Sequence, residues 1–130
     1  MSAYRTAKLD EINAEQWPYW APVRHHFGIE TFGVNAWRGK NGDRVITPHD
    51  HSDDGAPELY VVISGAAKFT IAGDDHEAAA VEFVWVDDPK AERVAYATAD
   101  DTVVLSIGAA AHGEKYEPSG WDTKYLEGAE

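Results

Sequence analysis

At 130 residues, the chain is long enough for a single domain with one sizeable core. Its 23 acidic residues against 11 basic ones give a net charge of −12 with histidine neutral, which repels phosphate backbones and anionic lipid and argues against nucleic-acid and membrane partners. The chain contains no cysteine, so disulfides, thiolate ligands and cysteine nucleophiles are excluded.

The chain divides into three stretches, which we expect to form one domain over residues 1–130. A polar leader with an aromatic end covers residues 1–22, where a weak helical pattern permits a turn or two of helix around Leu9–Gln16. The body covers residues 23–108, and a tail with a proline and several glycines covers residues 109–130.

The body consists of short apolar runs, rich in β-branched and aromatic residues and bounded by Gly, Asp, Asn or Pro, which is typical of strands. The runs that we expect to form strands are 32–38, 44–49, 58–64, 67–72, 82–86, 93–97 and 102–108. Long amphipathic stretches are missing between them, which excludes the crossover helices of a parallel sheet. The pattern therefore predicts an all-β, antiparallel sandwich or barrel.

Two histidines stand one residue apart at the end of the run at 44–49, and a glutamate opens the next run. Because strand residues i and i+2 face the same side, His49 and His51 project together, about 7 Å apart along the strand. Glu58 can add a carboxylate from the neighbouring strand, and imidazole with carboxylate suits Fe, Mn, Co, Ni or Zn. The alternative is that these residues only decorate a solvated acidic loop in front of a buried strand.

The segment from His49 to Gly65, "HDHSDDGAPELYVVISG", resembles the first motif of the cupin superfamily. In that motif an H-x-H pair is followed by a glutamate and, after six residues, by a glycine, and His49, His51, Glu58 and Gly65 fill these places. The resemblance covers roughly residues 30–108. It implies an all-β double-stranded β-helix, or jelly-roll, barrel with a site in its mouth, where these two histidines and Glu58 would hold a divalent metal.

The chain departs from the cupin pattern at several places. The gap from His51 to Glu58 holds six residues, where cupins usually have three or four, and the expected preceding glycine falls one place early, at Gly42. The second cupin motif normally ends in a further histidine ligand. Here Val81 stands at its first glycine, and the segment "DDPKAERV" at 87–94 contains no histidine.

Glu92 or Arg93 takes the place of the missing histidine, depending on a shift of one residue. Glu92 can ligate a metal, whereas the Arg93 guanidinium favours a carboxylate, either that of Glu58 or that of a bound molecule. We expect Arg93 to point into the pocket. The fourth ligand of the metal is then Glu92, His112, water or none.

Aromatic residues are candidates for the wall of the pocket. Tyr60 shares a face with Glu58 by the period of two, so its hydroxyl can orient a ligand if Glu58 points inward. Trp37, Phe83 and Trp85 can line the same cavity, although aromatic residues also fill ordinary cores.

Two functions of different classes fit these residues. One is a metal-dependent enzyme of the oxygenase, isomerase or decarboxylase type, acting on a small organic molecule. The other is a non-catalytic, metal-free barrel that binds a small molecule. The intact histidines and Glu58 favour the first, and the missing histidine of the second motif favours the second.

The ends of the chain bear on assembly and location. Aromatic residues outside the body, namely Trp17, Trp20, Trp121 and Tyr125, suggest a homodimer formed by edge strands or terminal segments. Neither a signal-peptide pattern nor an apolar run of membrane-spanning length is present, so we expect a cytoplasmic protein.

Overall fold

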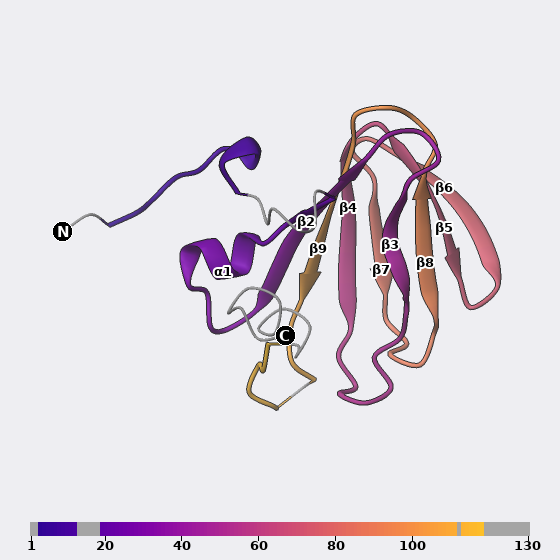
Figure 1. Ribbon diagram of the computed structural model, residues 1–130. Coiled ribbons are helices and arrows are strands. Elements are labelled where there is room, and N and C mark those ends of the chain that lie inside the picture. The colour runs from indigo at the N-terminus through magenta and orange to yellow at the C-terminus, as the bar shows by residue number, and fades with distance from the viewer. Residues whose placement is uncertain (1–2, 13–18, 112, 119–130) are drawn as a thin grey trace, which may run out of the picture.

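The computed structural model describes residues 3–12, 19–111 and 113–118 (Figure 1). Its elements are the 3-10 turn η1 (Leu9–Glu11), β1 (Trp20–Ala21), α1 (Val23–Phe27), β2 (Gly33–Gly39), β3 (Arg44–His49), β4 (Glu58–Ser64), β5 (Ala66–Ile71), β6 (Asp74–Ala79), β7 (Phe83–Val86), β8 (Arg93–Ala97) and β9 (Thr102–Gly108). No helix of the described segments is long and apolar enough to span a membrane.

The strands form two antiparallel sheets that face each other across the core (Figure 1). One sheet has the order β1-β2-β9-β4-β7, and the other has the order β3-β8-β5-β6. Several neighbouring strands come from distant parts of the chain, as when β9 lies between β2 and β4. This arrangement confirms the predicted all-β jelly-roll barrel.

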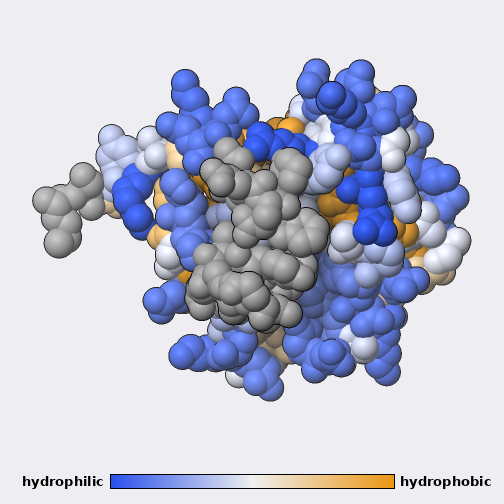
Figure 2. Space-filling model, in the orientation of Figure 1, coloured by the Kyte–Doolittle hydropathy of each residue, from blue (hydrophilic) through white to orange (hydrophobic). Residues whose placement is uncertain are grey.

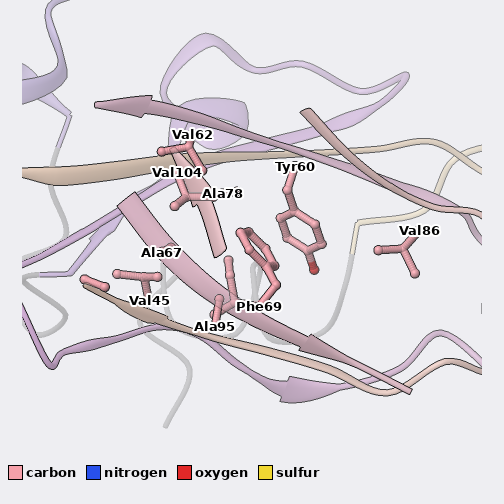
Figure 3. Packing of buried hydrophobic residues seen from close by; sticks show 11 residues of the cluster. Val45, Tyr60, Val62, Ala67, Phe69, Ala78, Val86, Ala95 and Val104 are labelled. Carbon is pink, nitrogen blue, oxygen red and sulfur yellow. The ribbon is translucent and has the colours of Figure 1, made fainter. Parts of the chain in front are cut away.

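The core lies between the two sheets (Figure 3). Its buried members are Val45, Ile46, Tyr60, Val62, Ala67, Phe69, Ala78, Val86, Ala95, Ala97 and Val104. Tyr60 and Val62 enter it from β4 by the period of two, and the rings of Tyr60 and Phe69 lie 5.4 Å apart. Burying each large apolar side chain stabilises the fold by about 1.5–3 kcal/mol.

A smaller cluster covers the outer side of β2 with α1 and the chain before it. Its buried members are Ile12, Ala21 and Ala36. Trp20 is 1% exposed and stacks on Trp37, with ring centroids 6.1 Å apart, so it is buried in its own chain and not free for the dimer contact that we expected. The other aromatic residues of that prediction, Trp17, Trp121 and Tyr125, lie outside the described residues.

The corner between β4 and β5 depends on Gly65, the last residue of the cupin-like motif. Its φ of 72° lies in the left-handed region, and a Cβ placed on it would lie 2.8 Å from the Thr102 Cα. A side chain there would be strained and would collide with β9. Glycine at this position therefore allows β4 to turn tightly into β5 beside the start of β9.

Candidate functional site

His49, His51 and Glu58 come together at one end of the barrel. His49 ends β3, His51 follows two residues later, and Glu58 opens β4 in the facing sheet. One ligand atom from each, Nε2 or a carboxylate oxygen, can be chosen so that all three lie within 4.8 Å of one another. All three residues are partly buried.

The long gap between His51 and Glu58 is folded into a turn. The backbone N–H of His51 donates to Pro89 O at 2.7 Å, and that of Gly55 donates back to His51 O at 2.7 Å. Gly55 has a φ of 66°, which closes the turn. The two or three extra residues relative to the usual cupin spacing are therefore absorbed without separating the three side chains.

Both imidazoles are oriented by the nitrogen that faces away from Glu58. His49 Nδ1–H donates to the carbonyl oxygen of Thr47 at 2.8 Å. His51 Nδ1–H donates to the carboxylate of Asp54, with distances of 3.2 and 3.3 Å to its two oxygens. In the neutral rings, Nε2 is then the unprotonated atom, and an acceptor on the second nitrogen is the usual support of a metal-ligating histidine.

The two Nε2 atoms face the same oxygen of Glu58. His49 Nε2 lies 3.4 Å and His51 Nε2 lies 3.3 Å from Glu58 Oε1. Despite that distance, His51 Nε2 is buried without a well-formed hydrogen bond among the described residues. Lone pairs that face a carboxylate repel it, and either a proton or a metal ion relieves the repulsion.

The donor set fits a divalent ion. Ligand atoms around a tetrahedral ion with bonds of about 2.1 Å are separated by about 3.4 Å, close to the two nitrogen–oxygen distances. The buried, poorly bonded Nε2 of His51 is the kind of polar atom that an ion would satisfy. Neutral imidazole with carboxylate is the donor chemistry of Fe, Mn, Co, Ni and Zn sites.

Glu58 is held by two further side chains. Tyr60 OH donates to Glu58 Oε1 at 2.5 Å, and Arg93 Nη1–H donates to the same oxygen at 3.0 Å. Burial alone would raise the pKa of Glu58, but the Tyr60 hydrogen bond and the imidazoles of His49 and His51, when Nε2 carries a proton, outweigh it and hold that pKa well below its usual range. Glu58 is therefore ionised at neutral pH.

The ionised glutamate also sets the protonation of its neighbours. The Glu58 carboxylate, assisted by that of Asp54, raises the pKa of His51 despite the opposing effect of burial. Burial and the Glu58 charge together raise the pKa of Tyr60 well above its ordinary value of 10.0. Tyr60 is thus a neutral hydrogen-bond donor and not a base.

A cavity of about 700 Å³ opens beside the three side chains. Trp37, Tyr60 and Ser106 form part of its wall, and Trp37 Nε1–H donates to Ser106 Oγ at 2.9 Å. Residues 109–111 and 114–117 of the tail line it as well. A cavity of this size accommodates a small organic molecule.

Of the residues predicted to line the pocket, some line the cavity and others do not. Tyr60 and Trp37 line the cavity. Arg93 is fully buried and contacts Glu58, which was one of its two predicted partners, the other being the carboxylate of a bound molecule. It does not line the cavity. It is therefore not placed to contact a molecule in the cavity.

Trp85 and Phe83 do not line the cavity, in contrast to our expectation. Their side chains are 57% and 63% exposed. Trp85 pairs with Leu59 in the register of β7 and β4, whereas Val86 pairs with Glu58. Directly paired residues share a face, so the valines of β7 face inward and its aromatic residues face outward.

A fourth protein ligand is not provided by the described residues. Glu92 is exposed, and no fourth His, Asp or Glu joins the group of three in the described part of the chain. His112, the other candidate, lies outside the described residues.

Sequence reasoning missed several contributors to the site. Thr47 and Asp54 orient the histidines, and their only signal is a short distance in sequence from His49 and His51. Asn35 and Ser106 line the cavity because β2, β9 and β4 are neighbours, in a register that pairs Asn35 with Ser106 and Ser106 with Tyr60. That pairing has no local signature.

Solved structures with the same fold support this architecture. A cupin protein from Bacteroides fragilis is 20% identical, with a TM-score of 0.67 over 91% of this chain and 93% of that one. A sugar phosphate isomerase of the cupin superfamily from Silicibacter pomeroyi is 15% identical, with a TM-score of 0.63 over 82% and 76%. A predicted oxalate decarboxylase from Thermotoga maritima is 17% identical, with a TM-score of 0.55 over 68% and 74%.

No protein-family model and no curated protein sequence matches the chain. The likeness to solved structures, at identities of 20% or less, therefore rests on the arrangement of the strands. With two antiparallel sheets in jelly-roll order and three side chains placed so that they could hold a metal ion at one end, this chain has the β-barrel fold of the cupin superfamily.

Proposed function

We propose that the protein binds a divalent transition metal through His49, His51 and Glu58 and acts on a small organic molecule in the adjacent cavity. The observation that carries the proposal is the orientation of the two imidazoles. Each donates through Nδ1 to an acceptor, so that both Nε2 atoms face Glu58 Oε1 at 3.3–3.4 Å. A solvated acidic loop would have no reason to fix both rings in this way.

The side chains around the ion would each have a defined task. Glu58 supplies the negative charge that offsets part of the ion's charge, and Thr47 and Asp54 keep the histidine lone pairs directed at it. A bound ion would act as a Lewis acid on a substrate oxygen or activate O2. Tyr60 remains protonated next to the cavity, where its ring forms part of the wall.

The reaction would be of the oxygenase, isomerase or decarboxylase type. Two of the three types have counterparts among the compared structures, which include a sugar phosphate isomerase and a predicted oxalate decarboxylase. One fold supports many reactions, so these neighbours support the range of chemistry and do not select a member of it.

The alternative function is a non-catalytic, metal-free barrel that binds a small molecule. The observation that favours it is that Glu58 Oε1 already accepts hydrogen bonds from Tyr60 and Arg93. An ion would have to share that oxygen or take the other one. The absence of a fourth ligand among the described residues points the same way.

Metal content separates the two functions. Protein purified without a histidine tag should carry near-stoichiometric metal or take it up on titration with Fe, Mn, Co, Ni or Zn, measured by elemental analysis. His51→Ala should abolish this, because two ligands hold a divalent ion poorly. The matched control is His76→Ala, because His76 is an exposed histidine on β6 that pairs with Glu82 away from the site.

The outcome decides between the classes of function. Loss of metal in His51→Ala with retention in His76→Ala supports the metal site. Protein that arrives without metal and binds none of the five ions on titration would exclude it, and the metal-free binding barrel would then be the better account.

A further inference from the structure

The wall of the cavity carries many carboxylates and few cations. Its acidic members are Asp50, Asp53, Asp54, Glu58, Glu114 and Glu117. Lys115 is the one lysine or arginine that lines the cavity within the described segments. An anionic molecule entering this cavity therefore meets mainly negative charge.

Arg93 does not compensate for this, although it lies near the site. It is fully buried and does not line the cavity. Its Nε–H and one Nη2–H donate to Ala91 O at 3.0 and 2.8 Å, and Nη2 also lies 3.4 Å from Asp88 O. Nη1 donates to Glu58. Recognition of a carboxylate or phosphate needs two parallel N–H groups directed at the ligand, and this guanidinium directs them at its own chain.

A bound metal would not reverse the balance. Six carboxylates would then face four positive charges, one from Lys115, one from Arg93 and two from the ion. The cavity would remain net negative, and in the metal-free protein it would be more so. Partly enclosed negative walls concentrate cations and repel anions.

The uncharged groups of the wall indicate what a ligand should offer. Asn35, Ser106 and Tyr60 form a row across β2, β9 and β4. The Oδ1 atom of Asn35 is buried and has no hydrogen-bond partner among the described residues. It is an acceptor, so it calls for an N–H or O–H donor on the bound molecule. The Trp37 ring beside this row offers a surface for an apolar or cationic part.

We propose that the cavity takes a small neutral or cationic organic molecule with hydroxyl or amine donors, and that it discriminates against phosphates and dicarboxylates. This rests on the proposed function, because the molecule would be the substrate of the metal site. It sets this chain apart from the compared isomerase and decarboxylase, whose names specify anionic substrates.

Three probes with one skeleton and different charge test the proposal without depending on the metal. These are 2-phenylethylamine, 2-phenylethanol and 3-phenylpropanoate, which carry an ammonium, a hydroxyl and a carboxylate on the same phenylethyl body. Their dissociation constants are measured by ligand-observed NMR on metal-loaded and on metal-free protein. We expect the ammonium and hydroxyl probes to bind at least tenfold more tightly than the carboxylate probe in the metal-free form, in which no ion can coordinate the carboxylate.

Reversing the charge of one residue tests whether the preference between probes arises at the wall of the cavity. Glu117→Lys should tighten binding of 3-phenylpropanoate several-fold and weaken that of 2-phenylethylamine. Asp74→Lys makes the same change in net charge on β6, away from the cavity lining, and should leave both constants unchanged. Carboxylate binding equal to or tighter than ammonium binding in the unaltered, metal-free protein, failure of all three probes to bind, or equal effects of the two variants would overturn the proposal.

The result is distinguishable from failure of the proposed function. Metal content is measured separately by elemental analysis, and the order of the probes on metal-free protein does not require an ion. If the protein binds no metal but still prefers the ammonium probe, the proposed charge preference of the cavity stands and the proposed metal-dependent function fails.

Discussion

Glu58 Oε1 is contacted by four side chains from three strands and one loop. Tyr60 and Arg93 donate hydrogen bonds to it, and His49 and His51 present Nε2 to it. Arg93 and a metal ion are both cations that would share this one carboxylate. The side chain that replaces the missing cupin histidine should therefore stabilise the metal-free protein and, by the same contact, weaken the proposed metal site.

Replacing Arg93 tests this competition. Arg93→Met keeps much of the side-chain volume but removes the charge, which leaves Glu58 as a largely buried anion without its arginine partner. Breaking a buried ion pair in this way should lower the free energy of unfolding of the metal-free protein by about 3–5 kcal/mol. Metal affinity should rise, since the ion no longer shares the carboxylate with a second cation. Urea denaturation and metal titration measure the two effects.

Arg38→Met is the matched control for Arg93→Met. Arg38 pairs with Asp10 at 3.1 Å, but the Asp10 side chain is 94% exposed, so the loss should be below about 1 kcal/mol. Equal destabilisation by the two variants, or an unchanged metal affinity in Arg93→Met, would contradict the competition.

The raised pKa of His51 gives the metal-free protein a specific dependence on pH. Because the folded pKa lies above the unfolded value of about 6.5, protonated His51 stabilises the fold fully below that value. This contribution is lost as the pH rises through the folded pKa. The melting temperature of chelator-treated protein should therefore fall from mildly acidic to mildly alkaline pH, and His51→Ala should flatten the curve. A melting temperature that rises over this range would show that His51 is not held in its charged form.

Metal binding should have the opposite dependence on pH. An ion requires the deprotonated Nε2 of His51, so protons compete with it over the range set by the same raised pKa.

At the scale of elements, two substitutions can distinguish the crowded glycine at the β4–β5 corner, Gly65, from a glycine in an open turn, Gly73. Gly65→Ala places a Cβ against Thr102 as well as in a left-handed conformation, whereas at Gly73, with a φ of 85°, nothing lies within 4 Å of a Cβ. Gly73→Ala should cost about 1–2 kcal/mol from the backbone alone. Gly65→Ala should cost about 1–3 kcal/mol more. Equal midpoints of urea denaturation for the two variants would argue against the close approach of β4–β5 to β9.

The strands that were predicted well are those in which the alternation of apolar residues and the turn residues agree. The predicted runs at 44–49, 58–64, 93–97 and 102–108 have the bounds of β3, β4, β8 and β9. The strand β6, "DDHEAA", was missed because one of its six residues, Ala78, is buried and the rest are exposed. Its position is set by pairing with β5, which is a tertiary effect.

The same reasoning explains which site residues were found. His49, His51 and Glu58 carry their own signal, since their spacing follows strand geometry and the cupin motif. The inward face of β7 carries no such signal. Its sequence "FVWV" is apolar on both faces, so the alternation of a strand does not tell which residues point inward. Its register against β4, which turns Trp85 outward, is fixed only when the sheet forms. Asn35 and Ser106 likewise become neighbours of Tyr60 only through long-range pairing.

At the scale of the whole molecule, exposed apolar residues gather on the outside of β4 and β7. Ile63, Phe83 and Trp85 are 45–63% exposed. β7 is an edge strand of its sheet, so its free backbone groups can pair with a copy of themselves. The surface seen in Figure 2 is mostly hydrophilic, in keeping with 26% charged residues in the chain. An apolar edge on such a molecule favours association with a second copy.

We propose on this basis that the protein is a homodimer through the β7 edge. Light scattering at micromolar concentration should give twice the chain mass of 14.3 kDa. Trp85→Lys should shift the mass to that of the monomer, whereas Tyr96→Lys, at an exposed aromatic residue of the other sheet, should not. Added salt should strengthen the dimer by screening the −12 charge of each copy. A monomer mass that persists on concentrating would exclude the dimer.

The wall of the cavity formed by residues 109–111 and 114–117 has a consequence for how this protein could diversify. Of the three proposed metal ligands, His49 and Glu58 stand on the paired strands β3 and β4 and His51 follows β3 by two residues, whereas this part of the wall is irregular chain beyond the last strand. Segments without ladder hydrogen bonds tolerate insertions and substitutions far better than strands do. Ligand preference can therefore change by drift in the tail while the barrel and its donor set are inherited intact, which makes the tail the natural target for libraries that seek new substrates.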